Sequence, residues 1–232
     1  MDVLALLLLI AAIVYLPKYK AHRAYKRSGY GEASGNSFWA VVSDRGCYGE
    51  FLTFSYLEKL DGYHKLLVNL YIPKKDGSTT EVDLIMISEH GIYVFESKNY
   101  SGWIFGDEKN RYWAQTLPRK QKNQFYNPIW QNNGHISALK SLLAMEDDLI
   151  YKSYIVFSER CTLKRITVTS PNVKVIKRDA VAGTIMQDMM YSCHRLPIQE
   201  VDRIYTLLQK YTRADAAVRE SHVQNIRSRK QD

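Results

Sequence analysis

Three apolar runs of the length of β-strands lie between residues 64 and 98. Residues 64–72 form one such run, and residues 81–87 and 92–98 form two more, separated by the short polar segment 88–91. This pattern predicts a strand followed by a hairpin. Both faces of the hairpin are apolar near its loop, so we expect it to lie in the centre of a sheet, covered on both sides.

Helical spacing surrounds these strands. Apolar residues recur every three or four positions in residues 48–60, and Asp61-Gly62 is typical of a helix stop. Asn127-Pro128 is typical of a helix start, and the helix is expected to run to about residue 145. Further elements are a small hairpin over 103–105 and 112–114, strands over 151–158 and 173–176, and helices over 178–190 and 197–211. The order predicts a mixed α/β fold, with one central mixed β-sheet flanked by helices.

The N-terminus carries an unbroken apolar run over residues 3–16. A membrane-spanning helix needs about 20 residues, and the residues on either side of the run extend it to residues 1–19. Five basic residues follow between 18 and 27, and no basic segment precedes the run, which disfavours a secretory signal. The positive-inside rule then predicts a single-pass membrane anchor with the soluble domain in the cytoplasm. A buried core helix and a shallow interfacial anchor are the alternatives.

Four segments are therefore expected along the chain. Residues 1–19 form the membrane anchor and residues 20–44 a basic juxtamembrane linker, rich in glycine and serine. Residues 45–212 form the folded domain, and residues 213–232 a charged C-terminal tail with few apolar positions.

Net charge indicates the class of binding partner, and cysteine content indicates the redox compartment. The net charge of +8 favours acidic partners, either nucleic acid or an anionic membrane surface, although a solvated basic surface has the same composition. The three cysteines are odd in number and include no Cys-x-x-Cys motif. We therefore expect free thiols in a reducing compartment, with neither a disulfide framework nor a zinc knuckle.

Two acidic residues of the hairpin are predicted to face each other. If Ile87 pairs with Ile92 across the loop, the same register places Asp83 directly opposite Glu96. Opposed carboxylates repel each other, and partial burial adds to the cost. A divalent cation between them would remove this penalty, and Mg²⁺ or Mn²⁺ suits an oxygen-rich site.

The same register places Glu81 opposite Lys98, and strand alternation would put all four charged residues on one face. Lys98 could then hold a phosphate oxygen or an attacking water as a point charge. The alternative is a structural salt-bridge ladder in which Glu81 and Lys98 form one rung.

Residues 82–85 (VDLI) and 91–99 (GIYVFESKN) resemble the nuclease-related domain (NERD) family, a branch of the PD-(D/E)xK nuclease superfamily. The resemblance extends over about residues 46–143. Its further motifs, in order, are Gly49-Glu50, Gly102 and Gly106 around 103–105, Trp113, and Asn127-Pro128 leading to Gln131 and His135. One departure is Val82, which stands where the superfamily pattern has proline.

The resemblance implies a restriction-endonuclease-like fold and specific residue roles. Asp83 and Glu96 would be metal ligands, with the Ser97 carbonyl as a third, and Lys98 would orient or activate the attacking water. Glu50 would be an accessory acid near the metal.

Three further groups of residues are candidates for supporting roles. Gln131 and His135 lie one turn apart on the helix after Asn127-Pro128 and would support the site, or else form a helix-end hydrogen-bond network. Glu81 is either a supporting acid or the partner of Lys98. A basic cluster in the segment between Trp113 and Asn127 would track a nucleic-acid backbone, or else form a solvated loop; it comprises Arg119, Lys120 and Lys122.

The sequence thus predicts a membrane-anchored, Mg²⁺- or Mn²⁺-dependent nuclease acting on DNA or RNA, with no organic cofactor and no particular oligomeric state. The alternatives are a catalytically inactive module that binds or senses nucleic acid, and a membrane-tethered adaptor that binds protein.

Overall fold

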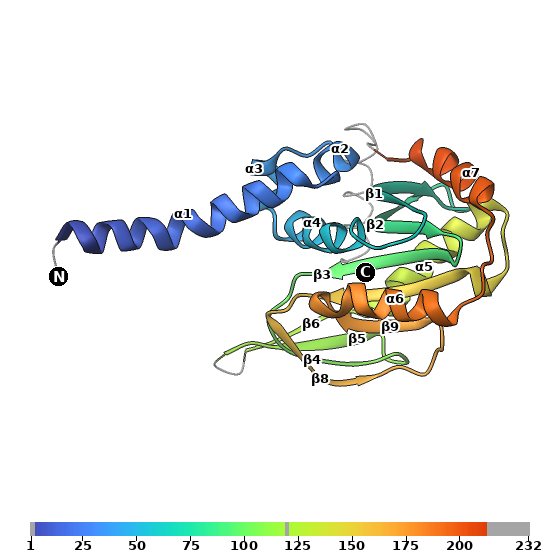
Figure 1. Ribbon diagram of the computed structural model, residues 1–232. Helices are drawn as coiled ribbons and strands as arrows, with labels where there is room; N and C mark the ends of the chain where they lie inside the picture. The colour runs from blue at the N-terminus through green and yellow to red at the C-terminus, as the bar shows by residue number, and fades with distance from the viewer. Residues whose placement is uncertain (1–2, 119–120, 213–232) are drawn as a thin grey trace.

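The computed structural model describes residues 3–118 and 121–212, with the backbone alone for residues 3–12 and 14 (Figure 1). The helices are α1 (Val3–Arg27), α2 (Tyr30–Ser34), α3 (Phe38–Ser43), α4 (Arg45–Leu57), α5 (Pro128–Leu143), α6 (Val181–Tyr191) and α7 (Ile198–Gln209). The strands are β1 (His64–Pro73), β2 (Thr79–Ser88), β3 (Gly91–Lys98), β4 (Gly102–Asp107), β5 (Tyr112–Thr116), β6 (Lys122–Tyr126), β7 (Tyr151–Phe157), β8 (Cys161–Thr167) and β9 (Val173–Lys177). Two 3₁₀ turns, η2 (Asp148–Ile150) and η3 (Arg178–Ala180), precede β7 and α6.

The described strands form two mixed sheets. The first has the order β1-β2-β3-β7-β9, in which β1, β2 and β3 are antiparallel neighbours and β3, β7 and β9 run parallel. The second has the order β6-β5-β4-β8. The predicted mixed α/β fold with flanking helices is confirmed, but the prediction of one sheet was wrong.

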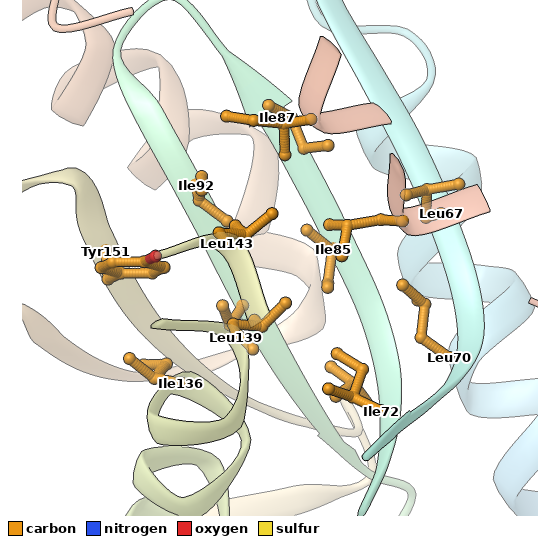
Figure 2. Packing of buried hydrophobic residues seen from close by; sticks show 14 of the residues in the cluster. Leu67, Leu70, Ile72, Ile85, Ile87, Ile92, Ile136, Leu139, Leu143 and Tyr151 are labelled. Carbon is orange, nitrogen blue, oxygen red and sulfur yellow. The ribbon is translucent and has the colours of Figure 1, made fainter. Parts of the chain in front are cut away.

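Helices cover both faces of the first sheet. On one face, Ile85 and Ile87 of β2 pack with Leu139 and Leu143 of α5, and residues of α7 extend the same cluster (Figure 2). On the other face, α4 and α6 pack on apolar side chains such as Phe95 of β3. Figure 1 shows α6 in front of these strands and α5 behind them. The hairpin β2–β3 is therefore central, as its two apolar faces predict.

One face of the second sheet packs against β7 of the first sheet and against α5. Ile104 and Trp113 join Phe157 of β7 and Ile129 of α5 in a separate buried cluster. The pattern did not predict β6 and β8, because both are rich in polar residues and largely exposed. β6 occupies part of the segment expected to be a basic loop.

The N-terminal segment is helical. α1 continues through Pro17 to Arg27, and Figure 1 shows it projecting beyond the sheets. In the described part of the chain, no helix has both the length and the apolar character needed to cross a membrane, so the structure gives no support to the anchor predicted over residues 1–19. The charged tail predicted over residues 213–232 lies outside the described residues.

The segment expected as a linker, residues 20–44, contains α2 and α3 folded onto α4. Tyr30 and Val41 are fully buried in the same cluster as Phe51 and Phe54 of α4. This packing matters for the site, because α4 also carries Glu50.

Candidate active site

The register predicted for the hairpin is observed next to its loop, but the predicted pairs Asp83–Glu96 and Glu81–Lys98 lie beyond the observed pairing. Pairing runs from Leu84–Phe95 to Ser88–Gly91 and includes Ile87 with Ile92. The loop contains two unpaired residues, two fewer than expected. Gly91 has φ +130°, and a Cβ there would lie 2.4 Å from the Ile150 carbonyl oxygen, so glycine is required at this turn.

The β2–β3 pairing stops at Leu84 and Phe95, just before Asp83. The β1–β2 pairing is interrupted at the same place, between Val68–Leu84 and Leu70–Val82. The residue of β1 at this break is Asn69, whose φ of +54° lies in the left-handed region. Asp83 therefore lies where the regular ladders on both of its sides are broken.

This break shifts the alternation of side chains along β2. Ile85 packs on the α5 side of the sheet and Leu84 on the α4 side, as alternation requires. Val82, however, packs on the α5 side too, although it stands two residues from Leu84. Residues before Asp83 are thus displaced to the opposite face from the one that regular alternation predicts.

Asp83 is held against β3 by its own side chain. Its Oδ2 accepts a hydrogen bond of 2.9 Å from the backbone N–H of Ser97. Burial, followed by the charges of Glu96 and Glu50, raises the pKa of Asp83 well above its ordinary value, although Lys98 and the Ser97 N–H act against this. Repulsion between the acids, which the hairpin predicts, is thus one cause of the raised pKa of Asp83, after burial.

Glu96 is buried, and both of its carboxylate oxygens have partners. Oε1 lies 2.6 Å from Nζ of Lys98, and Oε2 lies 3.2 Å from Nε2 of His135. Burial alone would raise the pKa of Glu96, but Lys98 and His135 outweigh it and hold the pKa below its ordinary value. Burial would lower the pKa of Lys98, but Glu96 and Asp83 outweigh it and raise that pKa.

The helix α5 supplies the supporting groups. Gln131 Oε1 accepts a hydrogen bond of 3.1 Å from Lys98 Nζ. His135 also contacts Thr80, whose Oγ1 lies 2.7 Å from Nδ1. If Nε2–H donates to Glu96, Nδ1 accepts from the threonine hydroxyl, so one tautomer satisfies both contacts. The structure therefore brings both candidates from this helix to the acid–lysine pair.

α5 is itself fixed to the sheet by a buried side chain. Asn132 donates to the Val94 carbonyl at 2.9 Å and to Ser153 Oγ at 2.8 Å. These two bonds join the helix to β3 and β7, which pair with each other in parallel, and so fix the position of Gln131 and His135 along the sheet.

Glu50 approaches from α4 on the other face of the sheet. The hydroxyl of Tyr30 donates to Glu50 Oε2 at 3.3 Å. Burial, followed by the charge of Glu81, raises the pKa of Glu50 to about 8, and Glu96 adds to this effect. Glu50 thus belongs to the electrostatic environment of the hairpin acids.

Glu81 is not placed where the sequence predicted. It pairs with Tyr71 of β1, whose hydroxyl donates to Glu81 Oε1 at 2.6 Å. The β2–β3 pairing ends before it reaches Glu81 and Lys98, and the shifted alternation turns Glu81 to the face of Glu50. The expectation that Glu81 shares a face with Lys98 was therefore wrong, and Lys98 instead bonds with Glu96 and Gln131.

The basic cluster is only partly described. Arg119 and Lys120 lie outside the described residues. Lys122 is exposed at the start of β6, opposite Thr116. It therefore belongs to the second sheet.

The donor set fits a hard divalent cation. In the described ranges, no three histidine, cysteine or acidic side chains are arranged to hold a metal by themselves. Asp83 and Glu96 would thus need further oxygen donors, such as main-chain carbonyls or water, which Mg²⁺ and Mn²⁺ accept readily. Burial of Asp83, followed by the nearby charges of Glu96 and Glu50, raises its pKa, and a bound cation would offset both effects.

Three residues of the site were not predicted. Thr80 reaches His135 only because of the shifted alternation, and Asn69 carries the break that causes it. Tyr30 lies in the segment expected as a linker. An asparagine inside an apolar strand is the one signal in the sequence that could have indicated the break, because asparagine tolerates the left-handed region.

Known proteins resemble this chain in the same region. The family model described as nuclease-related domain, NERD, matches residues 45–158, which include every candidate site residue from Glu50 to His135. The uncharacterized protein pXO1-01 of Bacillus anthracis is 35% identical over 187 residues, which cover 80% of this chain and 85% of that protein. No solved structure matches the chain.

Proposed function

Because the chain belongs to the NERD family of the PD-(D/E)xK-like nuclease superfamily, we propose that it is a metal-dependent nuclease that hydrolyses phosphodiester bonds in DNA or RNA. One observation carries this proposal. Asp83, Glu96 and Lys98 converge at one end of the central hairpin, and side chains of α5 hold two of the three in place.

Asp83 and Glu96 would hold a Mg²⁺ or Mn²⁺ ion. When bound, such an ion acts as a Lewis acid on a phosphoryl oxygen and lowers the pKa of a water. The two carboxylates come from neighbouring strands of a buried sheet, so their spacing is set by backbone geometry. This rigidity favours a fixed arrangement of the reacting groups.

Lys98 would act as a positive charge. Its raised pKa keeps the ammonium group protonated at neutral pH, so it donates hydrogen bonds and offsets negative charge on the phosphate. Gln131, which accepts from the same ammonium, would hold its direction. Lys98 is thus assigned to charge stabilisation, and removal of a proton from water falls to another group.

Glu50 would be the accessory acid. With a pKa of about 8, it changes protonation near neutral pH, in the range that suits a group exchanging protons with solvent. Tyr30 would position its carboxylate.

The test uses the full chain with labelled single- and double-stranded DNA and RNA, in Mg²⁺, Mn²⁺ or EDTA. We expect cleavage only with a divalent ion, and a loss of at least about 100-fold in Asp83→Asn and Lys98→Met. Lys140→Met is the matched control, because Lys140 is an ion-paired lysine on the same helix as Gln131 that bonds to Asp148 instead. Cleavage that is as fast in EDTA as with a divalent ion, or that survives Asp83→Asn, would contradict the proposal.

One observation favours a second candidate, a nucleic-acid-binding module without catalysis. Both oxygens of Glu96 already have partners, the ammonium group of Lys98 and a ring nitrogen of His135, so this carboxylate does not depend on a metal ion for a partner. The same assay separates the two functions: the module would bind labelled nucleic acid and leave it intact in every metal, with Asp83→Asn binding as the unaltered chain does.

A further inference from the structure

The second sheet has one buried face and one exposed face. Ile104, Trp113 and Cys161 point inward and are at most 3% exposed. On the other face, the rings of Trp103 and Tyr112 are each 50% exposed. A contiguous group of large exposed aromatic rings, rimmed by polar residues, is typical of an interaction surface.

The strand register shows that these exposed groups share one face. Trp103 pairs with Thr116 of β5 and with Thr162 of β8, and directly paired residues point the same way. Tyr112 lies four residues before Thr116 on the same strand and pairs with Tyr126 of β6. Aromatic side chains from three strands therefore lie on a single surface.

Basic side chains stand among these rings. The ammonium group of Lys164 lies 5.1 Å from the ring centre of Trp103, and the guanidinium group of Arg111 lies 5.4 Å from that of Tyr112. Lys122 lies on the outer strand, paired with Thr116. The four strands contain one carboxylate, Asp107, and its Oδ1 accepts the N–H of Lys109 in the turn after β4.

The aromatic surface extends from the second sheet to α5. Tyr126 contacts Trp130 of α5, with ring centres 6.3 Å apart. Trp130 is fixed by a bond of 2.8 Å from its Nε1 to the Glu108 carbonyl. The next residue is Gln131, which holds Lys98. A ring of this surface and the side chain that contacts Lys98 thus belong to consecutive residues of α5.

We propose that this surface binds single-stranded nucleic acid, so that a single strand is the substrate of the site described above. We call it the aromatic face, defined by Trp103, Tyr112, Tyr126, Trp130, Lys122 and Lys164. The proposal rests on the proposed nuclease function. The rings of the aromatic face would stack on bases, and the lysines of this face would contact phosphates.

The chemistry of the aromatic face selects a single strand over a duplex. In a duplex the flat faces of the bases are stacked on one another, so protein rings can reach them only after unstacking. A duplex would still meet the lysines, which contact phosphates without regard to base exposure. Stacking therefore predicts a preference that charge alone does not.

The test is fluorescence anisotropy of the full chain in EDTA, which separates binding from metal-dependent cleavage. The probes are end-labelled oligothymidine, oligouridine and a DNA duplex, each of about 20 nucleotides. We expect both single strands to bind at least about tenfold more tightly than the duplex, and the two single strands to show whether DNA or RNA is preferred.

Variants identify the surface. Trp103→Ala and Tyr126→Ala should each weaken single-strand binding at least about fivefold, the effect of losing one stacked base. Lys164→Met should weaken binding. It should also make the slope of the logarithm of the binding constant against the logarithm of the salt concentration shallower by about 0.7, the effect of losing one phosphate contact. Trp39→Ala is the matched control, because Trp39 is an exposed tryptophan on α3, and it should bind as the unaltered chain does.

Two results would overturn the aromatic face as a single-strand site: equal affinity for duplex and single strands, or unaltered affinity in both Trp103→Ala and Tyr126→Ala. These outcomes differ from failure of the nuclease proposal. Single-strand binding that depends on the aromatic face, with no cleavage in any metal, would reject only the nuclease. Cleavage dependent on Asp83 without single-strand preference would reject only the aromatic face.

Discussion

The carboxylate of Asp83 accepts the backbone N–H of Ser97 at 2.9 Å, at the point where the pairing of their two strands ends. The Asp83 side chain thus bonds β2 to β3 beyond the last pair of main-chain hydrogen bonds. The acid of one strand is thereby fixed beside Glu96 and Lys98 of the other. On the other side of Asp83 lies β1, whose pairing with β2 is interrupted at Asn69.

The left-handed backbone of Asn69 predicts a specific pattern of substitutions. Asn69→Gly should leave the free energy of unfolding nearly unchanged, because glycine adopts φ of +54° without steric cost. Asn69→Val should lower it by about 1–3 kcal/mol, because a β-branched side chain clashes in that region. Urea unfolding followed by circular dichroism measures both. Equal stability of the two variants would show that the break does not depend on this residue.

A divalent ion should stabilise the folded chain. Binding to the native state adds about 2.7 kcal/mol when the ion is at 100 times its Kd, which corresponds to about 5–10 °C in Tm for a chain of this size. Differential scanning calorimetry with Mg²⁺ or Mn²⁺ measures the shift. Asp83→Asn should abolish it, whereas Asp188→Asn, which removes an acid paired with Lys174, should keep it. An undiminished shift in Asp83→Asn would place the ion elsewhere.

Glu50 should make the metal-free chain less stable as pH rises. In the folded state its pKa is about 8, whereas an unfolded glutamate has a pKa of about 4.3. Between these values the folded chain holds a proton that the unfolded chain has released, so stability falls as pH rises from about 5 to about 8. Asp83, whose pKa is also raised, acts in the same direction.

The comparison that isolates this effect is Tm against pH in EDTA for the unaltered chain and for Glu50→Gln. The glutamine variant should show a smaller decline across the window, because it carries no proton to release. Identical slopes for the two proteins would mean that Glu50 has an ordinary pKa in the fold.

Loss of His135 should leave a buried carboxylate short of one partner. His135→Ala removes the contact to Glu96 Oε2, and we expect the free energy of unfolding to fall by about 1–3 kcal/mol. His135→Gln should recover part of the loss by offering another donor. His64→Ala, at the edge of β1, is the control and should cost less. Denaturant unfolding that ranks His64→Ala as the more harmful change would contradict this role.

Local sequence patterns were enough to predict the hairpin and the helix that supports it. The two apolar runs and the short loop between them specify the register of β2 and β3, because in a hairpin the length of the loop decides which residues pair. The cap at Asn127 likewise marks the start of α5, and its side chain accepts the N–H of Ile129 in the structure. Gln131 and His135 follow at fixed offsets from that cap.

The errors in the prediction have three different physical causes. Alternation assumes a regular strand, so it could not place Glu81, which changes face across the break at Asp83 and Asn69. Tyr30 was missed because it lies in a polar segment and is buried by long-range packing on α4. The second sheet was underestimated because the outer positions of β6 and β8 are polar.

The buried clusters extend well beyond the segment by which the family is recognised. Residues 45–158 lack α7, whose Val201, Ile204 and Leu208 cover one face of the first sheet, and they lack Tyr30 on the other. A polypeptide trimmed to the matched span would expose both faces to water and tend to associate. The recognisable signature and the cooperative folding unit therefore have different boundaries, and truncation should follow the latter.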